Sequence, residues 1–264
     1  MIHISRKQCT EPKKKKKRWL SPSSINAYLR CPRSFYLSKI AKRKQKPSIH
    51  LIRGIAVHNA VGEFYKRKLH RCGTADYSDL KNTVIDLFED EWDDQKDSLL
   101  ECKLSLDDIE FFMADSRNMM VNFLHDLVKG GGFEKEAPTI EKMLFSKKYL
   151  LLGRIDAIHN SRDPPLLIDF KTCKSKEVTE DYKRQLGIYA LLYKENFNIL
   201  PDVGIHFLKF QDGLETFQIT NDYVDEIRGF VLDLHAKTQS ENIEDYPCKC
   251  GWCKKNFGNI EAKV

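Results

Sequence analysis

Apolar and aromatic residues gather in three short runs in the middle of the chain, and turn-like residues separate them. The runs are Ile140–Phe145, Tyr149–Ile158 and Leu166–Lys171. A basic step at 146–148 divides the first two, and Asn, Ser, Arg, Asp and Pro residues at 160–165 divide the second from the third. Short apolar runs bounded by turn residues are typical of strands. The pattern therefore predicts three consecutive β-strands.

A helix is predicted after the third strand. Thr179 is suited to cap it, because a hydroxyl oxygen accepts a hydrogen bond from a free backbone N–H. Glu180 and Asp181 place acid in the first turn, and apolar residues then recur with helical spacing as far as Tyr193. The middle of the chain thus predicts three strands and a helix in succession.

A further strand pair and a final helix follow. Val203–Phe210 and Leu214–Ile219 flank residues 211–213, whose Gln-Asp-Gly sequence is common in hairpin turns. Asn221 is positioned to cap a last helix with apolar residues on its inner side. The order αβββαβ, with more helices before and after it, predicts an α/β (α+β) fold with a mixed central sheet flanked by helices.

The first half of the chain predicts a helical subdomain. Serines before Ile25 cap a short helix that Pro32 ends, and a second short helix follows. Leu51–Leu69 is interpreted as a long helix. Residues 77–129 are interpreted as helical core in two pieces, and glycines at 130–132 stop the second piece. We expect these helices to pack on the sheet or arch over it.

These elements predict a single domain, 19–264, behind a basic tail. The domain divides into a helical part, 19–130, a core, 138–240, and a cysteine-rich tail, 246–257, that packs back on the N-terminal part. Residues 1–18 end in six consecutive cations, and such a run cannot pack, so we expect disorder there. The tail is interpreted either as a solubilising extension or as a segment for phosphate contact or nuclear localisation.

Composition narrows the class of protein. A net charge of +6 with 31% charged residues suits a partner such as nucleic acid. No run of 18 apolar residues occurs and no apolar stretch follows the basic N-terminus, so we expect an intracellular protein, neither membrane-spanning nor secreted. With eight cysteines and no secretion signal, clustered thiols are interpreted as metal ligands before disulfides.

Carboxylates and a lysine are predicted to converge at the strand ends. Asp169 and Lys171 are two residues apart in a strand, so they share one face, and Asp156 joins them if its strand pairs with theirs. Crowded carboxylates favour a cation, and hard oxygen ligands suit Mg²⁺ or Mn²⁺. Gln185 and Tyr189 share one helix face, suited to hold a nucleic-acid strand near the metal. The alternative is a surface hairpin with charged tips and a helix whose polar residues only pack.

These residues resemble the PD-(D/E)XK nuclease superfamily, in particular its RecB-like exonuclease branch. The motifs that carry the resemblance are Gly153-Arg154-Ile155-Asp156, Asp169-Phe170-Lys171 and Gln185-x-x-x-Tyr189. The opening segment from Trp19 to Leu37 is similar to AddB-type and CRISPR-adaptation exonucleases. The resemblance implies a restriction-endonuclease-like core and a metal-dependent nuclease activity.

The resemblance also implies a set of metal ligands. Asp156, Asp169 and the backbone carbonyl of Phe170 would hold the ion, and the family places a glutamate near it, here Glu141. A histidine after the spacing G-x-x-x-H, here His58, reaches the metal in that family, and its nitrogen favours Mn²⁺ over Mg²⁺. The glycine of this spacing lies one helical turn before His58, so we expect it to leave room beside the imidazole.

Four cysteines form a second candidate metal site. Cys31 lies in a Cys-Pro-Arg step, and Cys248, Cys250 and Cys253 lie within six residues. In iron–sulfur members of the resembled family, one N-terminal and three C-terminal cysteines hold a [4Fe–4S] cluster, and four thiolates also suit Zn²⁺. The chain departs from that pattern, because Asn259 stands where the family usually has its last cysteine. We place [4Fe–4S] first, then Zn²⁺, then a site without metal.

The expected protein is a stand-alone deoxyribonuclease that degrades single-stranded DNA from free ends, in repair, recombination, replication or CRISPR adaptation. Lys171 would orient the attacking water or stabilise the pentacovalent transition state, while Gln185 and Tyr189 position the strand. Two alternatives remain: a nuclease subunit active only with a helicase, recombination or CRISPR-adaptation (integrase) partner, and a non-catalytic DNA-binding adaptor.

Overall fold

The protein is described here by a computed structural model, which covers residues 17–71, 76–131, 136–248, 250, 253 and 257. Four features named above lie outside these residues: the tail 1–16, Cys72, Gly132 and Asn259. The elements in chain order are α1 (Pro22–Arg30), α2 (Pro32–Phe35), η1 (Tyr36–Ile40), α3 (Ile49–Lys66), η2 (Leu69–Arg71), α4 (Tyr77–Asp93), α5 (Lys96–Cys102), α6 (Leu106–Lys129), β1 (Thr139–Ser146), β2 (Leu151–His159), β3 (Leu166–Lys171), α7 (Glu180–Phe197), β4 (Asp202–Phe207), β5 (Leu214–Phe217), α8 (Asn221–Thr238) and η3 (Ile243–Asp245).

A mixed five-stranded sheet with the order β1-β2-β3-β4-β5 forms the centre of the molecule. β1, β2 and β3 are antiparallel neighbours, β3 and β4 are parallel, and β4 and β5 are antiparallel. Parallel neighbours need a crossover connection, and α7 supplies it between β3 and β4. A mixed sheet flanked by helices confirms the predicted fold class.

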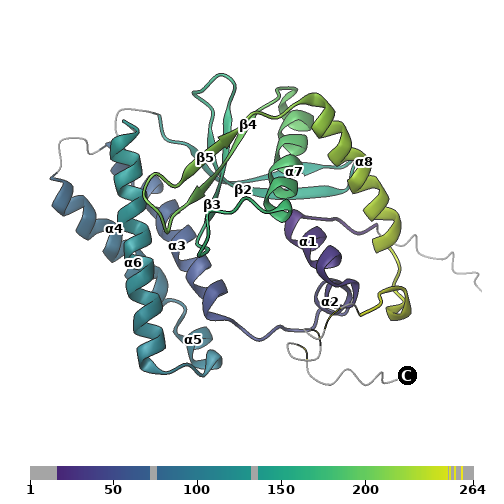
Figure 1. Cartoon of the computed structure of the whole chain (residues 1–264), viewed down its shortest axis with the longest axis horizontal. Helices are drawn as coiled ribbons and strands as arrows, with labels where there is room; N and C mark the ends of the chain where they lie inside the picture. Colours follow the sequence, from purple (N-terminus) through teal and green to yellow (C-terminus); the bar gives the residue numbers. More distant parts are fainter. Residues whose placement is uncertain are drawn as a thin grey trace, which may run out of the picture.

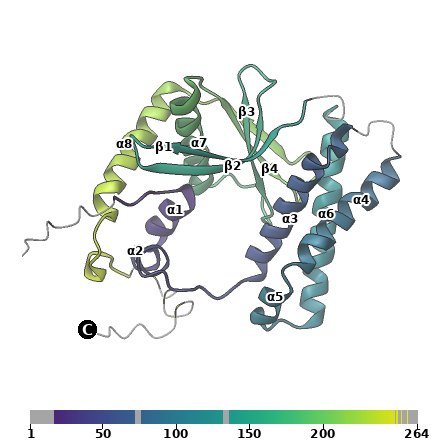
Figure 2. The same ribbon diagram turned by 180° about the vertical axis from the view of Figure 1, so that it is seen from behind.

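Helices cover both faces of the sheet. α7 and α8 lie on one face and α3, α4 and α6 on the other (Figure 1), and Figure 2 shows the same layers from behind. Leu167 of β3 packs in the first core, whereas Ile168 and Phe170 pack in different directions, both into the second core. Side chains alternate along a strand, so Asp169 points to the face that α7 covers.

The predicted strands and the helix α7 are confirmed, with some shifted ends. Thr179 caps α7 as predicted, its side chain accepting a hydrogen bond from Tyr182 N. β2 begins at Leu151 rather than at Tyr149, because Tyr149 belongs to the turn, where its backbone N–H donates to Ser146 Oγ at 3.2 Å. β4 and β5 likewise end before the residues that the apolar runs reach.

Three predicted helix features were wrong in detail. The helix predicted at 51–69 is Ile49–Lys66, because Ser48 caps it. The stretch 77–129 holds three helices instead of two pieces, since a short extra helix, α5, separates the long α4 and α6. Thr220, not Asn221, caps α8, because its hydroxyl accepts the hydrogen bond from the backbone N–H three residues on.

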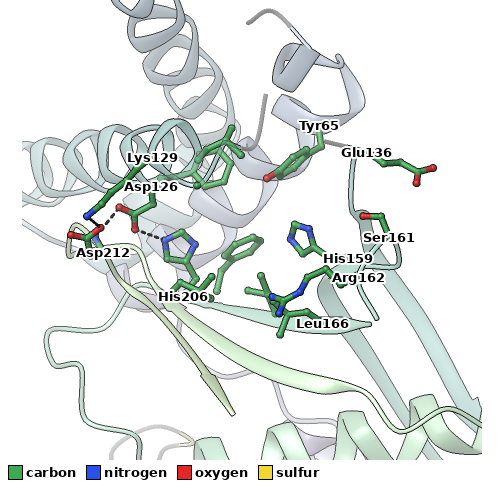
Figure 3. Close-up of a pocket in the computed structure, with 16 residues that line it drawn as sticks. Tyr65, Asp126, Lys129, Glu136, His159, Ser161, Arg162, Leu166, His206 and Asp212 are labelled. Carbon is green, nitrogen blue, oxygen red and sulfur yellow. Dashed lines mark hydrogen bonds and ion pairs between the residues drawn. The ribbon is translucent and has the colours of Figure 1, made fainter. Parts of the chain in front are cut away.

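Asp126 ties the end of α6 to the β4–β5 hairpin (Figure 3). Its carboxylate accepts hydrogen bonds from the backbone N–H of Asp212 at 2.8 Å and of Gly213 at 3.0 Å, and it pairs with His206 Nε2 at 2.9 Å. Burial opposes ionisation, but the bonds from His206, His125 and the two amides outweigh it and hold the pKa of Asp126 well below its usual range. The carboxylate therefore anchors the α6 end of the helical part to the sheet.

The two ends of the described chain meet beside α1 and α2. Arg33 Nε donates to the carbonyl of Tyr246 at 2.7 Å, and Arg18 pairs with Glu241 at 2.6 Å. Leu37 lies among the cysteine side chains that these two ends bring together. Among the described helices, none is long and apolar enough to cross a bilayer.

Candidate active site

The site begins where β2 and β3 separate. Their ladder ends at the pair Ala157–Ile168, and beyond it Asp156 Oδ2 accepts the backbone N–H of Phe170 at 2.8 Å. The Asp156 side chain therefore takes the place of the next ladder bond. The N–H and C=O of one strand residue point to the same edge, so the Phe170 carbonyl is directed to the same side as Asp156.

His58 approaches this opening from α3. Its Nδ1 lies 3.4 Å from Asp156 Oδ1, and its ring packs edge-on against Phe170 with centroids 6.0 Å apart. Burial alone would lower the pKa of the imidazole, but the hydrogen bond and charge of Asp156 outweigh it and raise that pKa. Burial opposes ionisation of Asp156 too, yet the bonds from His58 and Phe170 N hold its pKa below the ordinary value. The structure thus brings His58 and Asp156 together.

Asp169 is the most deeply placed carboxylate of the site, with 3% of the residue exposed. Its Oδ1 accepts a hydrogen bond from Gln185 Nε2 at 2.6 Å and lies 3.5 Å from the Tyr189 hydroxyl. Its Oδ2 lies 2.6 Å from Lys171 Nζ. Burial raises the pKa of Asp169, and the nearby charge of Asp156 raises it further against the opposing charge of Lys171.

Three groups fix the ammonium of Lys171. Besides Asp169, Nζ donates to Gln185 Oε1 at 2.9 Å and lies over the ring of Tyr182, 4.5 Å from its centroid. Gln185 therefore bonds both members of the Asp169–Lys171 pair, and it also bonds the Tyr189 hydroxyl at 2.9 Å. A side chain held in this way is pre-positioned for chemistry.

The donors fit a divalent metal ion. Asp156 and Asp169 supply carboxylate oxygens, the Phe170 carbonyl a neutral oxygen and His58 a nitrogen, a set that suits Mn²⁺ and Mg²⁺. Asp169 Oδ2 is buried and accepts no hydrogen bond from the residues that the structure describes. A buried carboxylate oxygen without a donor, beside a second carboxylate, gains the most from a bound cation.

A glycine on β2 lets α7 approach the site. A Cβ on Gly153 would lie 2.8 Å from Leu192 Cδ1 and 3.1 Å from Tyr189 Cε1, closer than carbon atoms normally pack. The missing side chain therefore allows Tyr189 to lie flat on the sheet and direct its hydroxyl toward Asp169. Gly54 does less than predicted. The nearest atom to a Cβ there is Thr172 Oγ1, at an ordinary 3.9 Å, so it creates no special room beside His58.

Glu141 lies at the site in register but not in contact. The β1–β2 ladder pairs Ile140 with Ala157 and Lys142 with Ile155, which sets Glu141 opposite Asp156. Its φ of 51° is in the left-handed region, costly for a side chain that branches from Cα. Its carboxylate pairs with Arg154 at 3.6 Å, and no described contact joins it to Asp156. The predicted role of Glu141 thus stays a prediction.

The four predicted cysteines come together at the meeting of the chain ends. The sulfur atoms of Cys31, Cys248, Cys250 and Cys253 all lie within 4.8 Å of one another. Cys31 Sγ is 3.4 Å and Cys250 Sγ 4.0 Å from Cys253 Sγ. Burial, and then the neighbouring thiols, raise the pKa of Cys253, as expected for thiols crowded together without a cation. Four crowded sulfurs are a donor set for a soft metal ion.

Two residues of the site were missed by sequence reasoning. Arg53, on α3, donates from Nη2 to the carbonyl of Thr172 and from Nη1 to Asp115 Oδ2 at 3.0 Å. Tyr182, on α7, lies under the Lys171 ammonium. The signal for Arg53 was a cation inside an otherwise apolar helix, which is almost never buried without a partner. Tyr182 gave no such signal, since a tyrosine in the first turn of a helix is ordinary.

The largest cavity of the molecule is separate from this cluster. It has a volume of about 700 Å³ and is lined by Tyr65, Arg162 and His206 among others (Figure 3). Of the predicted catalytic and metal-binding residues, only Phe170 among the described residues lines it. Cavity size therefore does not identify the active site here, whereas the convergence of charged side chains does.

Comparisons with known proteins agree with this geometry. The sequence profile of the PD-(D/E)XK nuclease superfamily matches residues 19–256. Among curated proteins none matches the chain. Among solved structures, a protein from Eubacterium rectale that carries the provisional name of exonuclease is similar over 94% of this chain and 91% of its own, with a TM-score of 0.57 and 12% identity. At that identity the likeness concerns the fold. The match of the profile to nearly the whole chain shows that the protein belongs to the PD-(D/E)XK nuclease superfamily.

Proposed function

We propose that the protein is a metal-dependent exonuclease acting on single-stranded DNA ends. The observation that carries the proposal is the cluster of Asp156, Asp169 and His58 around the Phe170 carbonyl, with the Lys171 ammonium 2.6 Å from Asp169. The similar structure from Eubacterium rectale, named provisionally an exonuclease, supports degradation from an end. The depth of Asp169 favours a single strand, because a slim chain reaches a recessed carboxylate more readily than a stiff duplex does.

The residues divide the work of hydrolysis. A divalent ion held by Asp156, Asp169, His58 and the Phe170 carbonyl would supply an acidified water and polarise the scissile phosphate. Lys171 holds its ammonium where negative charge grows on the phosphate, and it needs no reorganisation because Gln185 and Tyr182 already fix it.

Gln185 and Tyr189 act on the carboxylate more than on the DNA. Both lie against Asp169 Oδ1, and Gln185 bridges to Lys171. We therefore assign them to orienting Asp169 and Lys171, in place of the direct strand contact expected from the sequence. Glu141, opposite Asp156 in the ladder, is proposed as an additional carboxylate that turns from Arg154 toward the site when DNA is bound.

The cysteine site is proposed to hold one Zn²⁺ ion. A tetrahedral ion with Zn–S bonds of about 2.3 Å separates its sulfurs by about 3.8 Å, and the described separations of 3.4 and 4.0 Å bracket that value. A [4Fe–4S] cluster gives each thiolate its own iron and so holds the sulfurs further apart. The spacing therefore favours Zn²⁺ over the cluster placed first from the sequence. In either case the ion joins α2 to the C-terminal segment.

Linear and covalently closed single-stranded DNA of the same sequence test the proposal. With Mn²⁺ or Mg²⁺ we expect the linear strand to be degraded to short products and the circle to persist. Degradation of the circle at a similar rate would show an endonuclease. Absence of cleavage of either substrate would instead favour a nuclease that requires a partner, or a DNA-binding adaptor.

A further inference from the structure

A second, smaller cavity lies directly beside the proposed active site. Its volume is about 470 Å³, and it opens where β3 ends and the chain turns toward α7. The residues that line it come from the start of α3, the end of β3 and the first turn of α7: His50, Arg53, Lys171, Thr172, Cys173, Lys174 and Tyr182. Lys171 lines this cavity and also touches Asp169, so the cavity and the proposed metal ligands share one side chain.

The lining carries positive charge. It includes Arg53, Lys171 and Lys174, and no carboxylate occurs among the described residues that line it. Burial, and then the charges of Arg53 and Lys174, lower the pKa of His50, which reflects the positive potential there. Asp115 lies behind Arg53 and offsets part of this charge, but it is shared with a further lysine, whose Nζ lies 2.8 Å from Asp115 Oδ1.

Arg53 is a buried cation with an unused donor. Only 3% of the residue is exposed, and its two terminal nitrogens bond Asp115 and the carbonyl of Thr172. Its Nε is buried and has no hydrogen-bond partner among the described residues. A buried donor without an acceptor costs about 1–3 kcal/mol, so such a group usually meets a ligand or holds strain. The guanidinium fork matches the oxygens of a phosphate better than any other side chain.

We propose that this cavity binds a second phosphate of the nucleic acid, next to the one that is cleaved. The inference rests on the proposed function of the neighbouring site and adds to it a substrate contact. The phosphate is either the terminal monoester of a strand or an internal diester one step along the backbone. Lys174 and Arg53 supply the charge, Arg53 supplies the fork, and the ring of Tyr182 offers a surface on which a base can stack.

Binding measured without cleavage tests the subsite. The affinity of fluorescently labelled single-stranded oligonucleotides is measured by anisotropy in EDTA, with a 5′-phosphate, a 3′-phosphate or hydroxyls at both ends. Lys174→Ala is the main variant because Lys174 is exposed and its removal leaves the core intact. Lys147→Ala, at the exposed β1–β2 turn, is the matched control for loss of one surface charge. Arg53→Lys keeps the charge and removes the fork.

Loss of one phosphate contact on a single strand lowers the salt dependence, log K against log[salt], by about 0.7, which is about fivefold in affinity at 0.1 M salt. We expect this loss for Lys174→Ala and a loss of comparable direction for Arg53→Lys, but not for Lys147→Ala. A loss confined to one phosphorylated end identifies a terminal phosphate, and an equal loss on all three oligonucleotides identifies an internal one.

The subsite is refuted if Lys174→Ala binds all three oligonucleotides as Lys147→Ala does. That result is independent of catalysis, since no metal is present in the assay. A protein that binds as expected but never cleaves would overturn the proposed exonuclease function and leave the phosphate subsite supported. A protein that cleaves, but whose Lys174→Ala and Lys147→Ala variants bind alike, would overturn the subsite alone.

Discussion

Lys171→Met removes one charge from the centre of the site and keeps the length of the side chain. Lys171 Nζ lies 2.6 Å from Asp169 Oδ2, and the two side chains are 17% and 4% exposed. Removal of one partner from a buried ion pair costs roughly 3–5 kcal/mol. Lys171 keeps some solvent contact, and burial already raises the pKa of Asp169, so that the carboxyl can take up a proton. We therefore expect a lower cost, about 2–3 kcal/mol at neutral pH.

A second substitution tests the reason for that cost. If the instability comes from an uncompensated Asp169 charge, Asp169→Asn in the same chain removes the charge, and most of the lost stability returns. The assay is urea unfolding of wild type, both single variants and the double variant, in EDTA. Unchanged stability of Lys171→Met, or a double variant no more stable than Lys171→Met, would refute the described pairing.

Activity should not return with stability. Loss of one pre-positioned electrostatic group costs about 10²–10³ in rate, and loss of a metal ligand adds to it. The folded double variant is thus expected to cleave DNA at least about 10³-fold more slowly than wild type. A double variant whose single-turnover cleavage stays within tenfold of wild type would contradict the catalytic assignment.

Three further predictions concern other parts of the fold. Gly153→Ala should cost about 1–3 kcal/mol in the urea assay, because the new methyl group overlaps side chains of α7, whereas Gly229→Ala, with nothing within 4 Å, should be neutral or slightly stabilising. The lowered pKa of Asp126 means that its stabilisation is present above the unfolded pKa of about 3.9 and is lost as pH falls toward the folded value; Asp126→Asn should lower stability at pH 7 and remove this acid-dependent part of the unfolding curve. Cys31→Ser should abolish the one bound zinc found by elemental analysis and lower the thermal midpoint, whereas Cys102→Ser should keep the metal; a brown protein containing iron would overturn the zinc assignment.

Local sequence signals predicted the strands and α7 correctly because they rest on short-range physics. A hydroxyl at Thr179 followed by acidic residues specifies a helix start, and alternation within β3 specifies that Asp169 and Lys171 share a face. The choice of Asn221 over Thr220 as a cap failed for a related reason. Both side chains can cap, and backbone φ and ψ, which no propensity fixes, decided between them.

Features that depend on tertiary approach could not be predicted. The partners of Arg53 come from residues 62 and 119 positions away, so nothing local marks it as part of the site. Gln185 and Tyr189 were placed on the correct helix face, but the close packing on Gly153 that directs them to Asp169 appears only in three dimensions. The orientation of Glu141 follows from a left-handed backbone that its sequence does not signal.

The central claim is that Asp156, Asp169 and His58 form a metal-dependent nuclease site. Its most direct test is the single-turnover cleavage rate of end-labelled single-stranded DNA as Mn²⁺ is titrated, in wild type and in Asp169→Asn. We predict cleavage that requires Mn²⁺ in wild type and a rate at least about 10³-fold lower in Asp169→Asn at saturating metal. Equal Mn²⁺-dependent cleavage by the two proteins would contradict the account.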